Sequence, residues 1–312
     1  MLFSKYNKLF QGIILSLCII ILSTYAYYHR NQAAQLATEL GLVEAIIVFL
    51  TIGGQIGIRT ICEKLHYNSI GYNIPVFALY KLLAQQNVLN YLPFKAGTIY
   101  TASLLRLKYN IPIFHYAAVF TAQNLLALGT TLMAAGIALL FTQSISSQYF
   151  LASTVLIFAG IFTLAMLFIR IPNVHFFSTK INKNIRILSD AIAKCKQHPI
   201  TFLSVTILRF LAIALMTWRF QILFNMSDTE ISFSIALVLS ASMLISLFIA
   251  ITPAGLGIRE LLLAVTSSLM LIPPSTAVII SILERVLVLV FSAVIAVAGF
   301  FWTQSPTKSR HP

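Results

Sequence analysis

From Ala250 to Leu271 the chain reads AITPAGLGIRELLLAVTSSLML, a largely apolar stretch that contains Pro253, Gly255 and Gly257. Proline removes a backbone N–H and clashes with the preceding helical turn, whereas glycine adopts the φ values that reverse a chain. We therefore expect one helix to end before Pro253 and a short second helix to begin at Gly257.

A similar break occurs earlier, in Asn87–Lys108, which reads NVLNYLPFKAGTIYTASLLRLK. Here Pro93 precedes Gly97 by the same spacing that separates Pro253 from Gly257. After each break come a short stretch, a proline turn and a long apolar segment. The two regions are therefore predicted to share one architecture.

The spacing of polar residues within the long segments supports an internal duplication. The separation of Asn124 from Pro93 equals the separation of Glu284 from Pro253. A single offset, the one that relates Pro93 to Pro253, therefore superimposes both breaks and both polar positions. We place the cores of the two repeats at about residues 74–142 and 231–303.

Broken helices have a specific meaning in a membrane. Bare backbone in lipid costs several kcal/mol for each unsatisfied group, so such breaks survive only inside protein or beside a water-filled cavity. Paired breaks in two repeats are typical of a transporter's binding site. The alternative is a pair of prolines that end helices in interfacial loops.

The composition indicates a membrane protein throughout residues 1–312. Hydrophobic residues make up 59% of the chain and charged residues only 9%, against about 25% in a soluble domain. Roughly 20 apolar residues cross a bilayer as a helix. Seven stretches are candidates: Phe10–Tyr28, Gly41–Ile58, Pro112–Phe141, Tyr149–Ile169, Ile200–Phe224, Ile231–Thr252 and Ser275–Trp302. We predict a single all-α polytopic membrane domain.

The net charge of +13 comes largely from short loops between apolar segments. Residues 170–199 carry six lysines and arginines and one aspartate, the pattern of a cytoplasmic loop. Nucleic acid is not an expected partner, because the basic residues form no stripe with aromatics. The N- and C-termini, which are also basic, are predicted to be cytoplasmic.

These assignments give about six transmembrane helices plus two re-entrant broken-helix segments. The two segments would enter from opposite faces, so the repeats would be inverted. In the alternative, residues 231–252 span fully and the C-terminus lies outside. Phe10–Tyr28 is predicted to be an uncleaved first helix, with a cleaved signal peptide as the alternative.

Ionisable residues inside apolar helices are costly and are candidates for function. One interpretation is that Arg259, Glu260, Glu284 and Arg285 neutralise one another in a buried four-charge cluster. The other is that the arginines bind an anion, whose phosphate oxygens suit a guanidinium fork. Arg219, beside Trp218, is expected to reach the membrane interface. The predicted substrate-binding residues are Arg259, Glu260, Glu284, Arg285, Arg209, Lys95 and Asn124.

Catalytic arrangements find little support in the sequence. The histidines and cysteines are scattered, and no Asp-x-Asp pair could hold a metal for glycosyl or phosphoryl transfer. We therefore expect no metal, no cofactor and a carrier in preference to an enzyme, with Glu260 and Glu284 the only well-placed acids.

At the two breaks the sequence resembles a known family. The stretch TPAGLGIRE (Thr252–Glu260) is similar to the Pro-Gly-Gly-Leu-Gly-x-Arg-Glu signature of the lysylphosphatidylglycerol synthase transmembrane-region family, with Ala254 in place of the first Gly. The stretch NYLPFKAG (Asn90–Gly97) resembles the family's first conserved loop, although Lys95 and Thr98 depart from it. The resemblance covers essentially the whole chain.

The family resemblance implies a flippase-like module without an aminoacyl-transferase domain. From it we expect translocation of a lipid with an anionic headgroup across the bacterial inner membrane. That lipid would be amino- or glyco-modified, or a polyprenyl phosphate. Two alternatives stay open: a membrane-embedded glycosyl- or phospho-transferase of lipid-linked saccharide synthesis, and a non-transporting subunit that docks a lipid-modifying enzyme through the loop 170–199.

Overall fold

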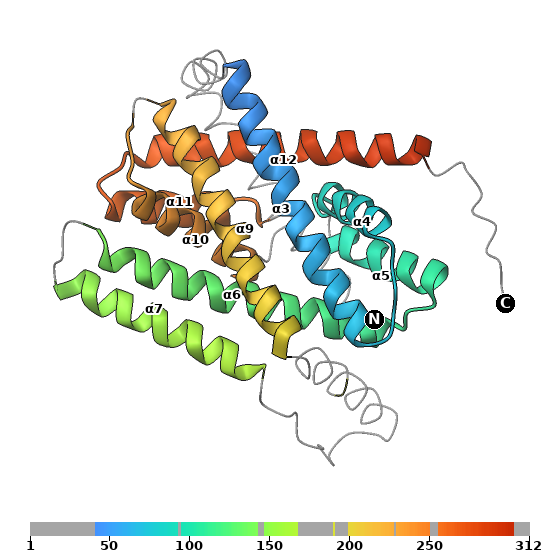
Figure 1. Ribbon diagram of the computed structural model, residues 1–312. Coiled ribbons are helices and arrows are strands. Elements are labelled where there is room, and N and C mark those ends of the chain that lie inside the picture. Colours follow the sequence, from blue (N-terminus) through green and yellow to red (C-terminus); the bar gives the residue numbers. More distant parts are fainter. Residues whose placement is uncertain are drawn as a thin grey trace, which may run out of the picture.

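The computed structural model describes residues 41–92, 95–142, 147–167, 190, 199–227, 229–249 and 255–302. All regular structure in these residues is helical, which confirms the predicted all-α fold (Figure 1). The helices are α3 (Leu42–Ser69), α4 (Val76–Leu89), α5 (Ala96–Tyr109), α6 (Ile113–Leu140), α7 (Ser147–Met166), α9 (Pro199–Asn225), α10 (Phe233–Ile249), α11 (Ile258–Leu269) and α12 (Pro274–Trp302).

Five of these helices, α3, α6, α7, α9 and α12, are long and apolar enough to cross a membrane. The chain is therefore a polytopic membrane protein. The predicted first helix, Phe10–Tyr28, lies outside the described residues, as does nearly all of the loop 170–199.

Helix α3 extends well beyond its predicted end at Ile58 and continues to Ser69. The predicted stretch ends at Ile58, and Arg59, Glu63 and His66 follow it. In the structure Glu63 and His66 are buried, Arg59 is partly buried, and all three residues bond to partners inside the protein, which offsets the cost of placing them in an apolar helix.

The other four helices in the described part of the chain are short, with 14 residues in α4 and in α5, 17 in α10 and 12 in α11. At 1.5 Å per residue they are about 18–26 Å long, less than the roughly 30 Å of a bilayer core. Helix α4 packs against α5, and α10 packs against α11. These lengths favour re-entrant pairs over full spans.

The glycines at the two breaks act differently. Gly255 and Gly257 have φ values of 70° and 84°, as predicted for a chain reversal. Gly97 instead lies in the first turn of α5, where an added Cβ would sit 2.2 Å from the carbonyl oxygen of Gln86. The positive φ in this half belongs to Lys95, at 51°. Gly97 therefore permits close packing of α5 on α4, and the prediction that it shapes the turn itself was wrong. Pro93 and Pro253 lie outside the described residues.

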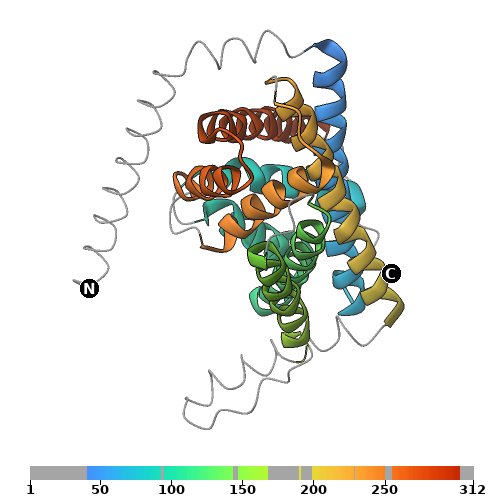
Figure 2. The same cartoon turned by 90° about the vertical axis from the view of Figure 1, so that its left-hand side faces the viewer.

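The short helices of each half pack against the other half. Helix α4 packs on α12, and α10 packs on α6, so each short pair contacts the long helix of the other half. Figures 1 and 2 show α3 and α9 side by side, with the short helices between α12 and the α6–α7 pair.

The ends of the two short helices α5 and α11 also match. Asn110 directly follows α5, Leu271 lies just beyond α11, and both have positive φ at nearly equivalent positions of the two halves. This pattern supports the duplication, whereas the repeat boundaries and the inverted orientation stay predictions.

Candidate functional site

The centre of the site is Glu284, which α12 buries in the middle of the protein. One carboxylate oxygen accepts a hydrogen bond from Arg219 Nη2 of α9 at 2.7 Å, and the other is paired with Arg259 of α11. Arg219 Nη2 also donates to Gln55 Oε1 of α3 at 3.0 Å. Side chains of α9 and α11 thus meet at one carboxylate of α12, and α3 joins them through Arg219.

A second ion pair lies beside the first. Arg285 Nη2 is 2.7 Å from Glu260 Oε1, and both side chains are buried. The other oxygen of Glu260 accepts a hydrogen bond from the backbone N–H of Gly257 at 2.8 Å. Glu260 therefore caps the N-terminus of α11, where its negative charge is also favoured by the helix dipole.

Tyr91 connects the first break to this site. Its hydroxyl donates to the backbone carbonyl of Arg285 at 3.3 Å. The turn between α4 and α5 is thereby held against α12, and α12 supplies both Glu284 and Arg285.

The charges of this cluster do not balance. Three arginines, Arg219, Arg259 and Arg285, face two glutamates, so one positive charge remains in a buried environment. Several guanidinium nitrogens have no hydrogen-bond partner among the described residues: Nε and Nη1 of Arg219, Nε of Arg259, and Nε and Nη1 of Arg285. Unpaired buried charge costs several kcal/mol, and an anion would supply both the missing charge and the missing acceptors.

The four residues do form one buried cluster, as one of the two interpretations expected, with Arg259 paired with Glu284 and Arg285 paired with Glu260. The prediction for Arg219 was wrong. Arg219 is 1% exposed and pairs with Glu284, whereas its neighbour Trp218 is 48% exposed. Consecutive residues point about 100° apart on a helix, so Trp218 faces outward while Arg219 faces inward. The high free-energy cost of an arginine in an apolar helix is the signal that could have identified Arg219 as a residue of the site.

The other predicted binding residues are placed elsewhere. Arg209 donates to Gln123 of α6, the neighbour of Asn124, and has no contact with Glu284. Asn124 is half-buried, and its side chain forms no hydrogen bond with the other described residues. Lys95 is exposed at the start of α5 and forms no ion pair within the described part of the chain. Gln55 and Tyr91 belong to the site and were not predicted.

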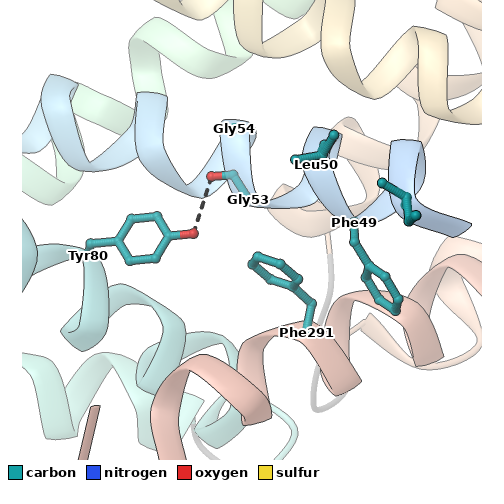
Figure 3. A pocket seen from close by; sticks show the side chains of 7 residues that line it. Phe49, Leu50, Gly53, Gly54, Tyr80 and Phe291 are labelled. Carbon is teal, nitrogen blue, oxygen red and sulfur yellow. Dashed lines mark hydrogen bonds between the residues drawn. The ribbon is translucent and has the colours of Figure 1, made fainter. Parts of the chain in front are cut away.

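An apolar pocket of about 410 Å³ lies between α3, α4 and α12 (Figure 3). The ring of Phe291 projects into it from α12, and Tyr80 of α4 donates to the carbonyl of Gly53 at 3.4 Å. Phe49 stacks on Phe291 with ring centroids 6.0 Å apart. Phe291 follows Glu284 by two helical turns, so the two share a face of α12 about 10 Å apart along its axis.

No group of three or more His, Cys, Asp or Glu side chains that could hold a metal ion occurs in the part of the chain that the structure describes.

Fold and site together define a polytopic helical membrane protein with a buried, net-positive cluster at the junction of its two halves. The model of the family described as "Lysylphosphatidylglycerol synthase TM region" matches residues 9–296, nearly the whole chain, so the protein belongs to this family. No curated protein and no solved structure matches the chain. Membership of the family indicates a function related to membrane lipids.

Proposed function

We propose that this protein translocates a lipid with an anionic headgroup across the bacterial inner membrane. The observation that carries the proposal is the unbalanced cluster of Arg219, Arg259, Arg285, Glu260 and Glu284. A headgroup phosphate matches its surplus charge and its unused N–H donors.

The apolar pocket beside the cluster supports a lipid rather than a small soluble anion. A lipid needs a polar place for its headgroup and an apolar surface for its chains. Phe291 of the pocket and Glu284 of the cluster lie on the same face of α12, so one molecule could contact both. The short helices add a further argument, because broken helices in two repeats surround the sites of many carriers.

The proposal includes the topology predicted from the basic loops, with both termini in the cytoplasm and two re-entrant segments in inverted repeats. In this topology the cluster lies where α9, α11 and α12 meet, within the depth of the bilayer. The glutamates would hold the arginines in place, and the arginines would contact the phosphate.

Reconstitution in liposomes tests the proposal. Fluorescently labelled phosphatidylglycerol is placed in both leaflets, and a membrane-impermeant quencher reports the fraction that reaches the outer leaflet. Wild-type protein should raise this fraction above that of empty liposomes, and Arg219→Gln and Arg259→Ala should lower the rate at least about tenfold. Arg106→Gln, which removes an exposed arginine from α5, serves as the control and should keep the wild-type rate.

Two results would contradict the proposal. Equal rates for wild type and both cluster variants would remove the cluster from the translocation path. A lipid product of altered mass after incubation would instead support a membrane-embedded transferase.

A further inference from the structure

Helix α3 carries a polar face that the charge cluster at Glu284 only partly uses. Gln55, Arg59, Glu63 and His66 follow one another at the intervals of a single helical turn, so they share one side of the helix. The distance from Gln55 to His66 along the helix axis is about 16 Å. Gln55 already bonds to Arg219, which leaves three polar side chains beyond the cluster.

Arg59 joins this face to the first short pair. Its Nε is 3.0 Å from Glu63 Oε1, and its Nη2 donates to Gln86 Oε1 of α4 at 3.1 Å. Gln86 is itself buried, and its amide lies 3.4 Å from Thr98 Oγ1 of α5. Arg59 is therefore held by polar groups on α3 and α4 close to the first break.

His66 lies at the far end of the polar face. Its Nδ1 contacts the Gln123 amide of α6, and the Gln123 oxygen accepts from Arg209 of α9. Arg209 has no carboxylate partner among the described residues, and its buried Nε has no hydrogen-bond partner there either. The partner of Arg209 is thus the neutral amide of Gln123, whereas the partner of Arg219 is the carboxylate of Glu284.

The charges at this end are also unbalanced. Arg59 and Arg209 face a single carboxylate, Glu63, which leaves one positive charge, as in the first cluster. Helices α3 and α9 run antiparallel, with Gln55 beside Arg219 and the His66–Gln123 pair beside Arg209. From the positions of Arg209 and Arg219, the two clusters are separated by about 15 Å along α9.

We propose that Arg59, Glu63, His66, Gln123 and Arg209 form a second phosphate-binding station. The polar face of α3 from Gln55 to His66 connects it to the cluster at Glu284. This inference rests on the proposed function, since the ligand is the same anionic headgroup. Each station carries the same surplus of one positive charge for a headgroup. The two stations lie at different depths, with polar side chains between them. A path of this kind avoids placing the headgroup in hydrocarbon.

Counting bound lipid tests the second station directly. Purified protein in detergent is titrated with phosphatidylglycerol, and native mass spectrometry reports the number of molecules retained. Wild type should retain two, whereas Arg209→Gln and Arg59→Gln should retain one, with the second binding at least about tenfold more weakly. Lys64→Gln removes a charge from a different side of α3 and should retain two.

Further measurements distinguish a lipid phosphate from free phosphate and show whether the variants are folded. Arg209→Lys, which keeps the charge, should recover part of the binding, and all variants are compared by their thermal melting. If inorganic phosphate raises the melting temperature of wild type but not of Arg209→Gln, while phosphatidylglycerol has no effect, the station binds a free anion and the lipid assignment is wrong.

The second station and the translocation proposal can fail separately. If Arg59→Gln and Arg209→Gln both retain two lipids while Arg219→Gln retains fewer, the second cluster is structural and the station is refuted. If no lipid moves in liposomes but the predicted stoichiometry holds, the station stands as a binding site and translocation is refuted.

Discussion

Replacing Glu284 by glutamine should be among the most damaging isosteric changes in this protein. The change removes the carboxylate that pairs with both Arg219 and Arg259, and it raises the surplus charge of the cluster from one to two. Removing one partner of a buried ion pair costs about 3–5 kcal/mol. At about 2 °C per kcal/mol, the melting temperature should fall by roughly 6–10 °C.

A double-mutant cycle measured by thermal melting in detergent isolates the cause. Arg219→Gln added to Glu284→Gln restores the original surplus charge and should recover part of the loss, because contacting residues are not additive. Glu230→Gln, in an exposed position before α10, is the matched control and should change little. Strictly additive effects, or a loss below about 1 kcal/mol for Glu284→Gln alone, would refute the reasoning that the cluster is buried and coupled.

Three further changes probe the packing of the helices and the contact of Tyr91 with α12. Gly97→Ala should cost about 1–3 kcal/mol in melting experiments, since its Cβ would meet the immobile Gln86 carbonyl; an unchanged melting temperature would contradict the α4–α5 contact. Gly160→Val should destabilise similarly, because a Cβ there would lie 2.6 Å from Met133 Cγ on α6, and loss of α7 packing is detectable by limited proteolysis. Tyr91→Phe should cost about 1 kcal/mol, because it removes the hydrogen bond to the Arg285 carbonyl. Tyr100→Phe, which removes an exposed hydrogen bond to Gln85, is its control, and equal losses for the two variants would oppose a special role for Tyr91.

Much of the site could be predicted from the sequence, because charged residues in apolar segments have a high free-energy cost and are easily recognised. Arg259, Glu260, Glu284 and Arg285 stand out in apolar surroundings, and their mutual pairing is confirmed. The sequence could not indicate which arginine pairs with which glutamate. That choice depends on the rotation of α11 against α12 and on the capping of α11 by Glu260, which occupies one glutamate at the helix start.

The errors share one physical origin. Arg219 was expected at the membrane interface and the second apolar stretch was expected to end at Ile58, because a single sequence does not reveal which side of a helix is covered. The same reason applies at the predicted Asn124: its neighbour Gln123 is the residue that bonds to Arg209, and about 100° of helical rotation separates the two side chains. Gly97 was expected to turn the chain, whereas the close approach of α4 is what requires glycine there.

The two helix breaks, before α5 and before α11, were determined by local chemistry. Proline, glycine and the supply of apolar residues dictate a membrane protein with interrupted helices, and each of these signals acts within a few residues of the chain. The tertiary structure alone decided that the two halves interlock, so that α9 brings Arg219 to Glu284 and Arg209 to Gln123. Such pairings join residues 65 and 86 positions apart, and only the packing of complete helices selects the faces that meet.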